Sequence, residues 1–138
     1  MWHFTDVFYH TDADRLDMVS AEEMKNVGIS ALATAYTLAS ADETTTIQLI
    51  EEIQNNAIER LTTEYELSKE AIDKGSSITA EQHIIEVWTS WYKEALAKMS
   101  DIHTKASTKL IKAKIAEAIH NVDSTYKSLN ALLEKQTK

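Results

Sequence analysis

The feature that most constrains the fold is the near absence of residues that break helices. The 138-residue chain contains no proline, and its two glycines are Gly28 and Gly75. Proline and glycine are the residues that most strongly interrupt helices and form turns. The sequence therefore predicts an all-α protein in which a few long helices are joined by short connections.

Capping residues locate the ends of these helices. Ser20 begins a capping-box pattern with Glu23, Asp42 is placed to cap a second helix, and Thr79 begins another capping-box pattern. Gly75 is suited to end the second helix. These signals predict helices over residues 20–41, 43–74, 80–104 and 108–135. The long helices are expected to form an antiparallel bundle of three or four helices.

Apolar residues recur at helical spacing through the last two predicted helices. A single helix over this stretch would be about 80 Å long at about 1.5 Å per residue, so a break is expected in the polar patch 100–108. One continuous helix is the alternative. The apolar stripe comprises Ile84, Trp88, Trp91, Tyr92, Ala95, Leu96, Met99, Ile102, Ala106, Leu110, Ile115, Ile119, Val122, Tyr126, Leu129 and Leu133.

Composition excludes several classes of function. The net charge of −8 argues against a nucleic-acid-binding protein, which normally has a basic surface. No apolar run reaches the roughly 18 residues of a membrane span, and no signal peptide is recognisable. The absence of cysteine removes disulfides and thiolate ligands. Localisation stays open, because a signal peptide on a longer protein would make it secreted or periplasmic.

The N-terminal residues lack helical periodicity. Trp2, Phe4 and Val7 alternate with polar residues, which predicts a short extended segment. No credible second strand follows in the sequence, and the backbone groups of a buried lone strand would be unpaired. This end is therefore expected to belong to a sheet that another part of a longer protein supplies.

Residue types capable of metal and acid–base chemistry crowd into the same region. His10 is preceded by His3 and Asp6 and followed by three further acids, Asp12, Asp14 and Asp17. Imidazole and carboxylate groups are the ligands of zinc and similar metals. On spacing alone, an exposed acidic loop is the more common interpretation.

The same residues resemble a known motif. The segment His10-Thr11-Asp12-Ala13-Asp14-Arg15-Leu16-Asp17, followed by Met18-Val19-Ser20, resembles the closing motif of the M28 family of zinc aminopeptidases. In that family the motif leads from the last part of the sheet into the C-terminal helix of the catalytic domain. The resemblance covers about the first 40 residues and includes the helix that begins at Ser20.

The resemblance implies a function for the longer protein. Two zinc ions would activate a water molecule that attacks a peptide carbonyl. His10 would bind one of them, and Asp14 and Asp17 would shape the turn. The other ligands and the general base would lie upstream of this chain. By itself, the chain is therefore expected to be inactive and to hold no zinc tightly.

The resemblance also implies a domain organisation. Residues 1–41 would end the catalytic domain, and residues 42–138 would be an appended helical bundle that packs, dimerises or covers the approach to the active site. The partners would be the upstream catalytic domain and a peptide substrate. The helix over 20–41 is apolar around much of its circumference, so without that domain it is expected to self-associate through residues 24–39. The alternative is a stand-alone helical interaction module in which His10 is incidental.

Three other groups of residues are weaker candidates for a site. Three histidines have no ligand-like spacing and are expected at solvated helix positions: His83, His103 and His120. An aromatic group at spacing i, i+3 and i+4 is expected in a core or an interface: Trp88, Trp91 and Tyr92. Four lysines are expected on a solvated face opposite the acidic 43–74 helix, with an anionic partner as the second interpretation: Lys105, Lys109, Lys112 and Lys114.

Overall fold

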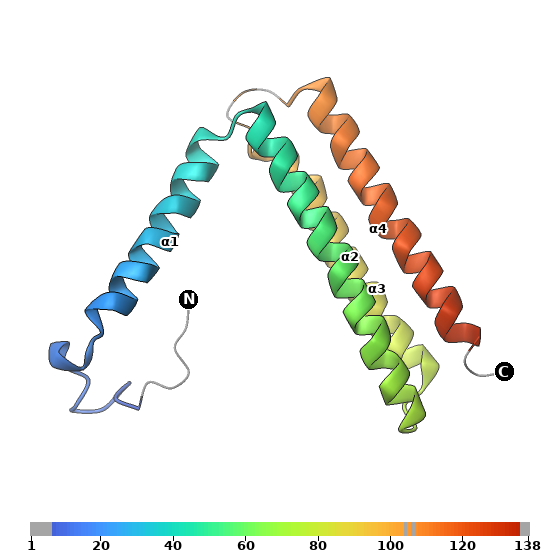
Figure 1. Ribbon diagram of the computed structural model, residues 1–138, viewed down its shortest axis with the longest axis horizontal. Coiled ribbons are helices and arrows are strands. Elements are labelled where there is room, and N and C mark those ends of the chain that lie inside the picture. Colours follow the sequence, from blue (N-terminus) through green and yellow to red (C-terminus); the bar gives the residue numbers. More distant parts are fainter. Residues whose placement is uncertain (1–6, 104, 106, 136–138) are drawn as a thin grey trace. The chain divides into compact units, whose positions relative to one another are not determined.

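The computed structural model describes residues 7–103, 105 and 107–135. Within these ranges every regular element is a helix, which confirms the all-α prediction (Figure 1). The chain divides into two compact units, Met1–Ser40 and Ala41–Lys138. The elements in chain order are η1 (Leu16–Met18), α1 (Ala21–Ser40), α2 (Glu43–Asp73), α3 (Ile78–Lys98), η2 (Met99–Asp101) and α4 (Lys109–Lys135).

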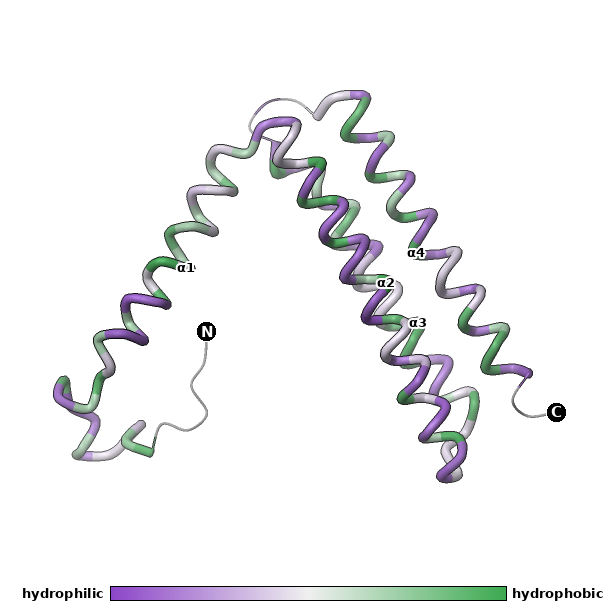
Figure 2. The backbone as a smooth tube through the Cα atoms, viewed as in Figure 1, coloured by the Kyte–Doolittle hydropathy of each residue, from purple (hydrophilic) through white to green (hydrophobic). Residues whose placement is uncertain are grey.

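The second unit is a three-helix bundle. Each of α2, α3 and α4 packs against the other two, and consecutive helices run in opposite directions (Figure 1). Hydrophilic and hydrophobic residues alternate along these helices, as expected for amphipathic segments that share one core (Figure 2). The buried core consists of Ile50, Ala57, Leu61, Ile85, Leu96, Met99, Ile111, Ile115, Ala118, Val122 and Leu133.

The two ends of α2 form as the sequence predicts. The side chain of Asp42 accepts a hydrogen bond of 2.8 Å from the backbone N–H of Thr45, so it caps the first turn. At the other end, Gly75 adopts a φ of 102°, in the left-handed region that favours glycine. The N–H of Gly75 donates to the carbonyl of Ile72, and the N–H of Ser76 donates to the carbonyl of Ala71, each at 2.9 Å. This pair of bonds is a Schellman motif.

The predicted start of α3 is wrong by two residues. The helix begins at Ile78, and the capping side chain is Ser77, which accepts from the N–H of Ala80 at 3.2 Å. The expected capping box at Thr79 would have directed the Gln82 side chain back to the Thr79 backbone. In the structure Gln82 donates to Glu134 on α4 at 3.3 Å, and the buried Glu81 carboxylate accepts a hydrogen bond of 2.6 Å from the Ser76 hydroxyl. The Schellman turn brings Ser76 and Ser77 to the helix start, so Thr79 falls inside it.

The connection between α3 and α4 interrupts the apolar stripe. α3 ends at Lys98 and is followed by the short η2 helix, so the prediction of a helix to residue 104 is wrong. The next helix begins after Thr108, whose hydroxyl accepts from the N–H of Ile111 at 3.1 Å. The alternative of one continuous helix is also wrong. The break lies in the expected polar patch, where no glycine or proline marks it.

The predicted apolar stripe is buried or packed against the core along most of α3 and α4, and it is wrong at three positions. Ile84, Trp91 and Leu110 are exposed, whereas the neighbouring Ile85 and Ile111 are fully buried. One residue corresponds to a rotation of about 100° around a helix. The predicted stripe includes both Trp91 and Tyr92. Tyr92 packs against the core and Trp91 is exposed, so apolar spacing alone did not distinguish these two neighbours.

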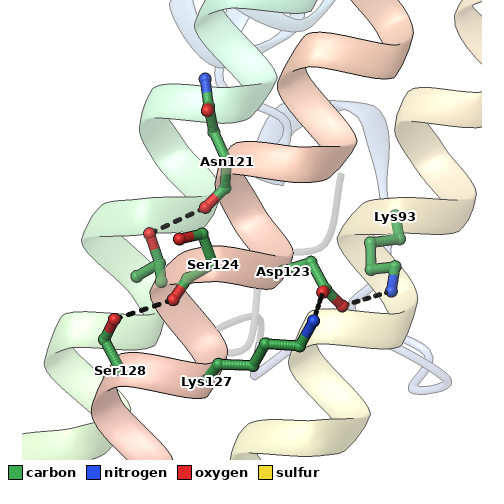
Figure 3. Close-up of polar contacts among 7 residues, drawn as sticks. Lys93, Asn121, Asp123, Ser124, Lys127 and Ser128 are labelled. Atoms are coloured by element: carbon green, nitrogen blue, oxygen red, sulfur yellow. Dashed lines mark hydrogen bonds and ion pairs between the residues drawn. The ribbon is translucent and has the colours of Figure 1, made fainter.

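Polar contacts link the helices on the outer side of the core. Asp123 on α4 accepts from Lys93 on α3 and pairs with Lys127 one turn away, each at 2.7 Å (Figure 3). The hydrogen bonds from Lys127 and Lys93 lower the pKa of Asp123 to about 2. Asn121 on α4 donates to Gln54 on α2 at 3.1 Å, which fixes a second pair of helices.

The first unit contains α1, which is described along its whole length and has no buried residue. Apolar residues follow one another along most of this helix (Figure 2). Leu32 and Tyr36 are each 71% exposed. Trp2 and Phe4 of the expected extended segment lie outside the described residues, and Val7 lies at an exposed bend. Residues 7–15 form bends and turns that lead into η1.

Candidate functional site

Thr11 holds together the turn that contains His10. The Thr11 hydroxyl donates a hydrogen bond of 2.7 Å to the carbonyl of Phe8, and the Thr11 N–H donates to the same carbonyl at 3.0 Å. The Thr11 hydroxyl also accepts from the N–H of Ala13 at 3.2 Å. One threonine side chain therefore links the residues on both sides of His10, which is a role the hydroxyl can perform as donor and acceptor together.

His10 occupies an unusual backbone conformation on this turn. Its φ is 62°, and it is the one non-glycine residue with positive φ in the part of the chain that the structure describes. Its side chain is exposed, and the ring centroids of Tyr9 and His10 are 3.9 Å apart. Left-handed backbone at a non-glycine residue costs free energy and is concentrated at functional sites.

The acids after His10 lie along the chain without gathering around the imidazole. The backbone N–H of Asp14 donates to the carbonyl of Thr11 at 3.1 Å, and Arg15 Nε donates to the carbonyl of Asp12 at 3.0 Å. Asp17 lies in the first turn of η1, and all three acid side chains are exposed. Both Asp12 and Asp14 thus take part in the turn through their backbones. His3 and Asp6 lie outside the described residues.

Among the described residues, those around His10 fit one position of a zinc site and do not form a complete one. A catalytic zinc needs about three protein ligands and one open position. The described residues contain no group of three or more histidine, cysteine, aspartate or glutamate side chains that could hold a metal ion. His10 has an exposed imidazole, so it could supply one ligand to a metal held mainly by other residues.

The segment after the turn leads directly into a capped helix. The Ser20 hydroxyl accepts from the N–H of Glu23 at 3.2 Å, and the Ser20 carbonyl accepts from the N–H of Met24 at 3.0 Å. Glu22 and Glu23 lie in the first turn of α1, where negative charge suits the helix dipole. The Ser20 half of the predicted capping box therefore forms.

The other histidines lie far apart in the bundle. His83 is exposed on α3, with its Nδ1 atom 3.4 Å from Glu86, and His120 is exposed on α4. His103 is half-buried in the connection before α4, where its Nδ1 atom lies 3.0 Å from the carbonyl of Lys105. The prediction of a solvated helix position for His103 is therefore wrong, because α3 ends earlier than expected.

The basic residues after the joint are mostly solvated. Lys105, Lys109 and Lys112 are exposed. Lys114 forms an ion pair of 3.0 Å with Glu117, and the hydrogen bond from this pair raises the pKa of the lysine, with a smaller contribution from Glu51 on α2. This contribution agrees with the expected pairing of a basic face with the acidic α2 helix.

The aromatic group of α3 borders a groove that the sequence interpretation did not identify. Arg60 lies over the Trp88 ring at 4.1 Å from its centroid and forms an ion pair with Glu64, which is buried. Trp91 is 57% exposed and packs edge-on against Tyr92 at a centroid distance of 4.8 Å. The groove has a volume of about 510 Å³ and is lined by Ile53, Asn56, Glu59, Arg60, Thr63, Trp91, Tyr92 and Ala95.

Comparisons of the chain with protein-family models, curated proteins and solved structures found no match. Among the helices that the structure describes, none combines the length and the apolarity needed to cross a bilayer.

Proposed function

We propose that this chain is the C-terminal region of an M28-like zinc aminopeptidase, which hydrolyses peptide bonds as the full-length protein. Residues 1–41 end its catalytic domain, and residues 42–138 form an appended helical bundle. His10 supplies one zinc ligand, while the remaining ligands and the general base come from the upstream domain. The isolated chain does not catalyse hydrolysis and holds no zinc tightly.

The observation that carries this proposal is the backbone at His10. A left-handed φ of 62° on an exposed histidine is costly, and the hydrogen bonds of Thr11 hold the turn in this shape. His10 is exposed on this turn, so its imidazole could serve as a ligand to a metal that other residues hold. The resemblance of the segment to the family motif supports the proposed ligand role of His10.

The exposed apolar surface of α1 supports the same proposal. A helix that is apolar around much of its circumference normally packs against protein on more than one side. α1 has no buried residue, although its sequence contains five alanines, two leucines and one isoleucine. An upstream catalytic domain would cover this surface, and the turn with His10 would then lie at the edge of that domain.

The proposal is tested by zinc binding to the isolated chain and to the full-length protein. The isolated chain is expected to bind zinc weakly, and His10→Ala is expected to remove what binding there is. In the full-length protein His10→Ala is expected to remove peptidase activity, whereas the matched control His120→Ala retains it. Tight stoichiometric zinc binding or peptidase activity of the isolated chain would contradict the proposal.

The second candidate function is a helical protein–protein interaction module without enzymatic activity. The bundle α2–α4 favours it, because this unit has a core of its own and a groove bordered by the exposed Trp91. The reading frame upstream of Met1 distinguishes the two functions. A preceding stretch with the missing ligands supports the peptidase, and a native start at Met1 supports the module.

A further inference from the structure

An arginine, a tryptophan and a glutamate form a packed group beside the groove between α2 and α3. The Arg60 guanidinium lies over the Trp88 ring at 4.1 Å from its centroid and pairs with the buried Glu64 carboxylate. A guanidinium is planar and weakly hydrated, so it stacks on an aromatic face while its N–H groups bind a carboxylate. The bundle therefore already holds one arginine between an aromatic ring and an acid.

The next tryptophan and glutamate along the groove have no such cation. Trp91 lies about one helical turn after Trp88, Glu59 immediately precedes Arg60, and both Trp91 and Glu59 line the groove. Trp91 is 57% exposed, and Glu59 is exposed as well. Among the residues that the structure describes, no cation lies over the Trp91 ring, and the Glu59 carboxylate forms no ion pair. The groove thus offers an aromatic ring and a carboxylate to a cation from another molecule.

Neighbouring side chains fix the Trp91 ring. It packs edge-on against Tyr92 at a centroid distance of 4.8 Å, and its centroid lies 6.2 Å from that of the core-packed Trp88. A ring that is already fixed loses little conformational freedom when a ligand stacks on it. Asn56 and Thr63 also line the groove, and their side-chain oxygens can accept hydrogen bonds from the N–H groups of a guanidinium.

The charges around the groove favour a cationic ligand. Residues 43–66 of α2 contain several acids and a single cation, Arg60, which is already paired. Glu94 adds an exposed carboxylate on α3, although Lys98 one turn later compensates it in part. The net charge of −8 gives the chain a field that attracts cations.

We propose that this groove binds an arginine side chain of a partner protein, with the guanidinium stacked on Trp91 and paired with Glu59. The contact repeats the arrangement of Arg60 on Trp88. An apolar ligand in the same place would take the Glu59 carboxylate out of water without a partner, which is costly. The contact goes beyond the proposed peptidase function and does not involve His10, so its failure would leave the proposed zinc ligand unaffected.

Titration of the full chain with a short peptide tests this contact. The probe is an acetylated and amidated Gly-Arg-Gly peptide, and its matched control carries citrulline, which has nearly the shape of arginine and no charge. The indole N–H signal of Trp91 in nuclear magnetic resonance, assigned with Trp91→Phe, reports binding. The arginine peptide is expected to shift this signal saturably at low salt, with a Kd on the order of 1 mM. The citrulline peptide is expected to bind about tenfold more weakly.

Charge-matched variants of α2 distinguish the groove from the acidic surface in general. Glu59→Gln is expected to weaken binding of the arginine peptide about threefold, because an exposed ion pair is lost. Glu51→Gln removes the same charge beside Lys114 on α4 and is expected to leave the affinity nearly unchanged. Trp91→Ala is expected to abolish the shifts of the backbone amide signals of residues 53–63. Trp91 and Glu59 are exposed, so both variants are expected to keep the melting temperature of the natural chain.

Four results would overturn the proposed contact. Equal affinity for the arginine and citrulline peptides would show that the groove does not recognise the charge. Equal weakening by Glu59→Gln and Glu51→Gln would assign binding to the acidic surface as a whole. Tighter binding of a Gly-Leu-Gly peptide would indicate an apolar occupant. A Trp91 signal that shifts with protein concentration alone would indicate that a second copy of the chain covers the groove.

Discussion

At the scale of single residues, the two glycines differ in their backbone conformation. Gly75 has a φ of 102°, which an L-residue adopts only with strain, and Gly28 lies inside α1 with ordinary helical backbone. Apart from the adjacent residues and the backbone of its own helix, a Cβ atom at either position would meet no atom within 4 Å. Any effect of replacing them therefore arises from the backbone and not from packing.

Replacement by alanine is therefore expected to change stability in opposite directions at the two positions. Gly75→Ala is expected to destabilise the bundle by about 1–2 kcal/mol, because alanine disfavours left-handed backbone. Gly28→Ala is expected to stabilise α1 by about 0.5–1 kcal/mol, because alanine loses less conformational freedom in a helix. Chemical denaturation measures the first effect, and circular dichroism at low temperature measures the second. Equal effects at both positions would contradict the assigned backbone.

The lowered pKa of Asp123 predicts how the stability of the fold depends on pH. Its pKa in the folded chain is about 2, below the ordinary value of 3.8, because Lys127 and Lys93 donate hydrogen bonds to its carboxylate. A lowered pKa stabilises the fold above the unfolded pKa, and that contribution is lost as pH falls from about 4 to about 2. Asp123→Asn is therefore expected to lower the melting temperature at pH 7 and to have little effect near pH 2.

Melting curves between pH 2 and pH 7 check this expectation. Lys127→Ala serves as a partial control, because it removes one of the two donors and leaves the contact with Lys93. Its loss of stability at pH 7 is expected to be smaller than that of Asp123→Asn. A variant Asp123→Asn whose melting temperature falls with pH as steeply as that of the natural chain would refute the assignment.

At the scale of elements, capping signals predicted both ends of α2, and apolar spacing predicted the buried side of α4 except at Leu110. Asp42 and Gly75 act in α2 as predicted, because each makes short-range bonds with its own helix. The start of α3 was predicted wrongly, because Ser77 and Thr79 are both competent caps and the Schellman turn at Gly75 brings the first of them to the helix start. The buried side of α3 depends on contacts with α2 and α4, which the sequence of one helix does not contain.

The apolar surface of α1 predicts self-association of the isolated chain through residues 24–39. Leu32→Glu is expected to reduce that association, because it places a charge at a position that is 71% exposed within the apolar surface. The melting temperature of the bundle is expected to stay unchanged, since α1 belongs to the other compact unit. Light scattering of the natural chain and of the Leu32→Glu variant over a range of concentrations measures the change in association. A natural chain that is strictly monomeric would contradict the prediction.

At the scale of the whole molecule, the predicted fold and the proposed zinc site depend on different sets of residues. The bundle α2–α4 buries its own core, so its helices could be predicted from caps and apolar periodicity. The candidate zinc site depends on residues beyond the segment around His10. The turn of Thr11 and the left-handed φ of His10 could not be predicted from spacing, because they arise from backbone hydrogen bonds within the turn.

The most direct test of the proposed function is the zinc content of the full-length natural protein, measured for the natural sequence and for His10→Ala. The account predicts two zinc ions per chain in the natural protein and the loss of zinc in the variant, with the helical content unchanged. A natural protein that begins at Met1 and contains no zinc would contradict it. So would an unchanged zinc content in His10→Ala.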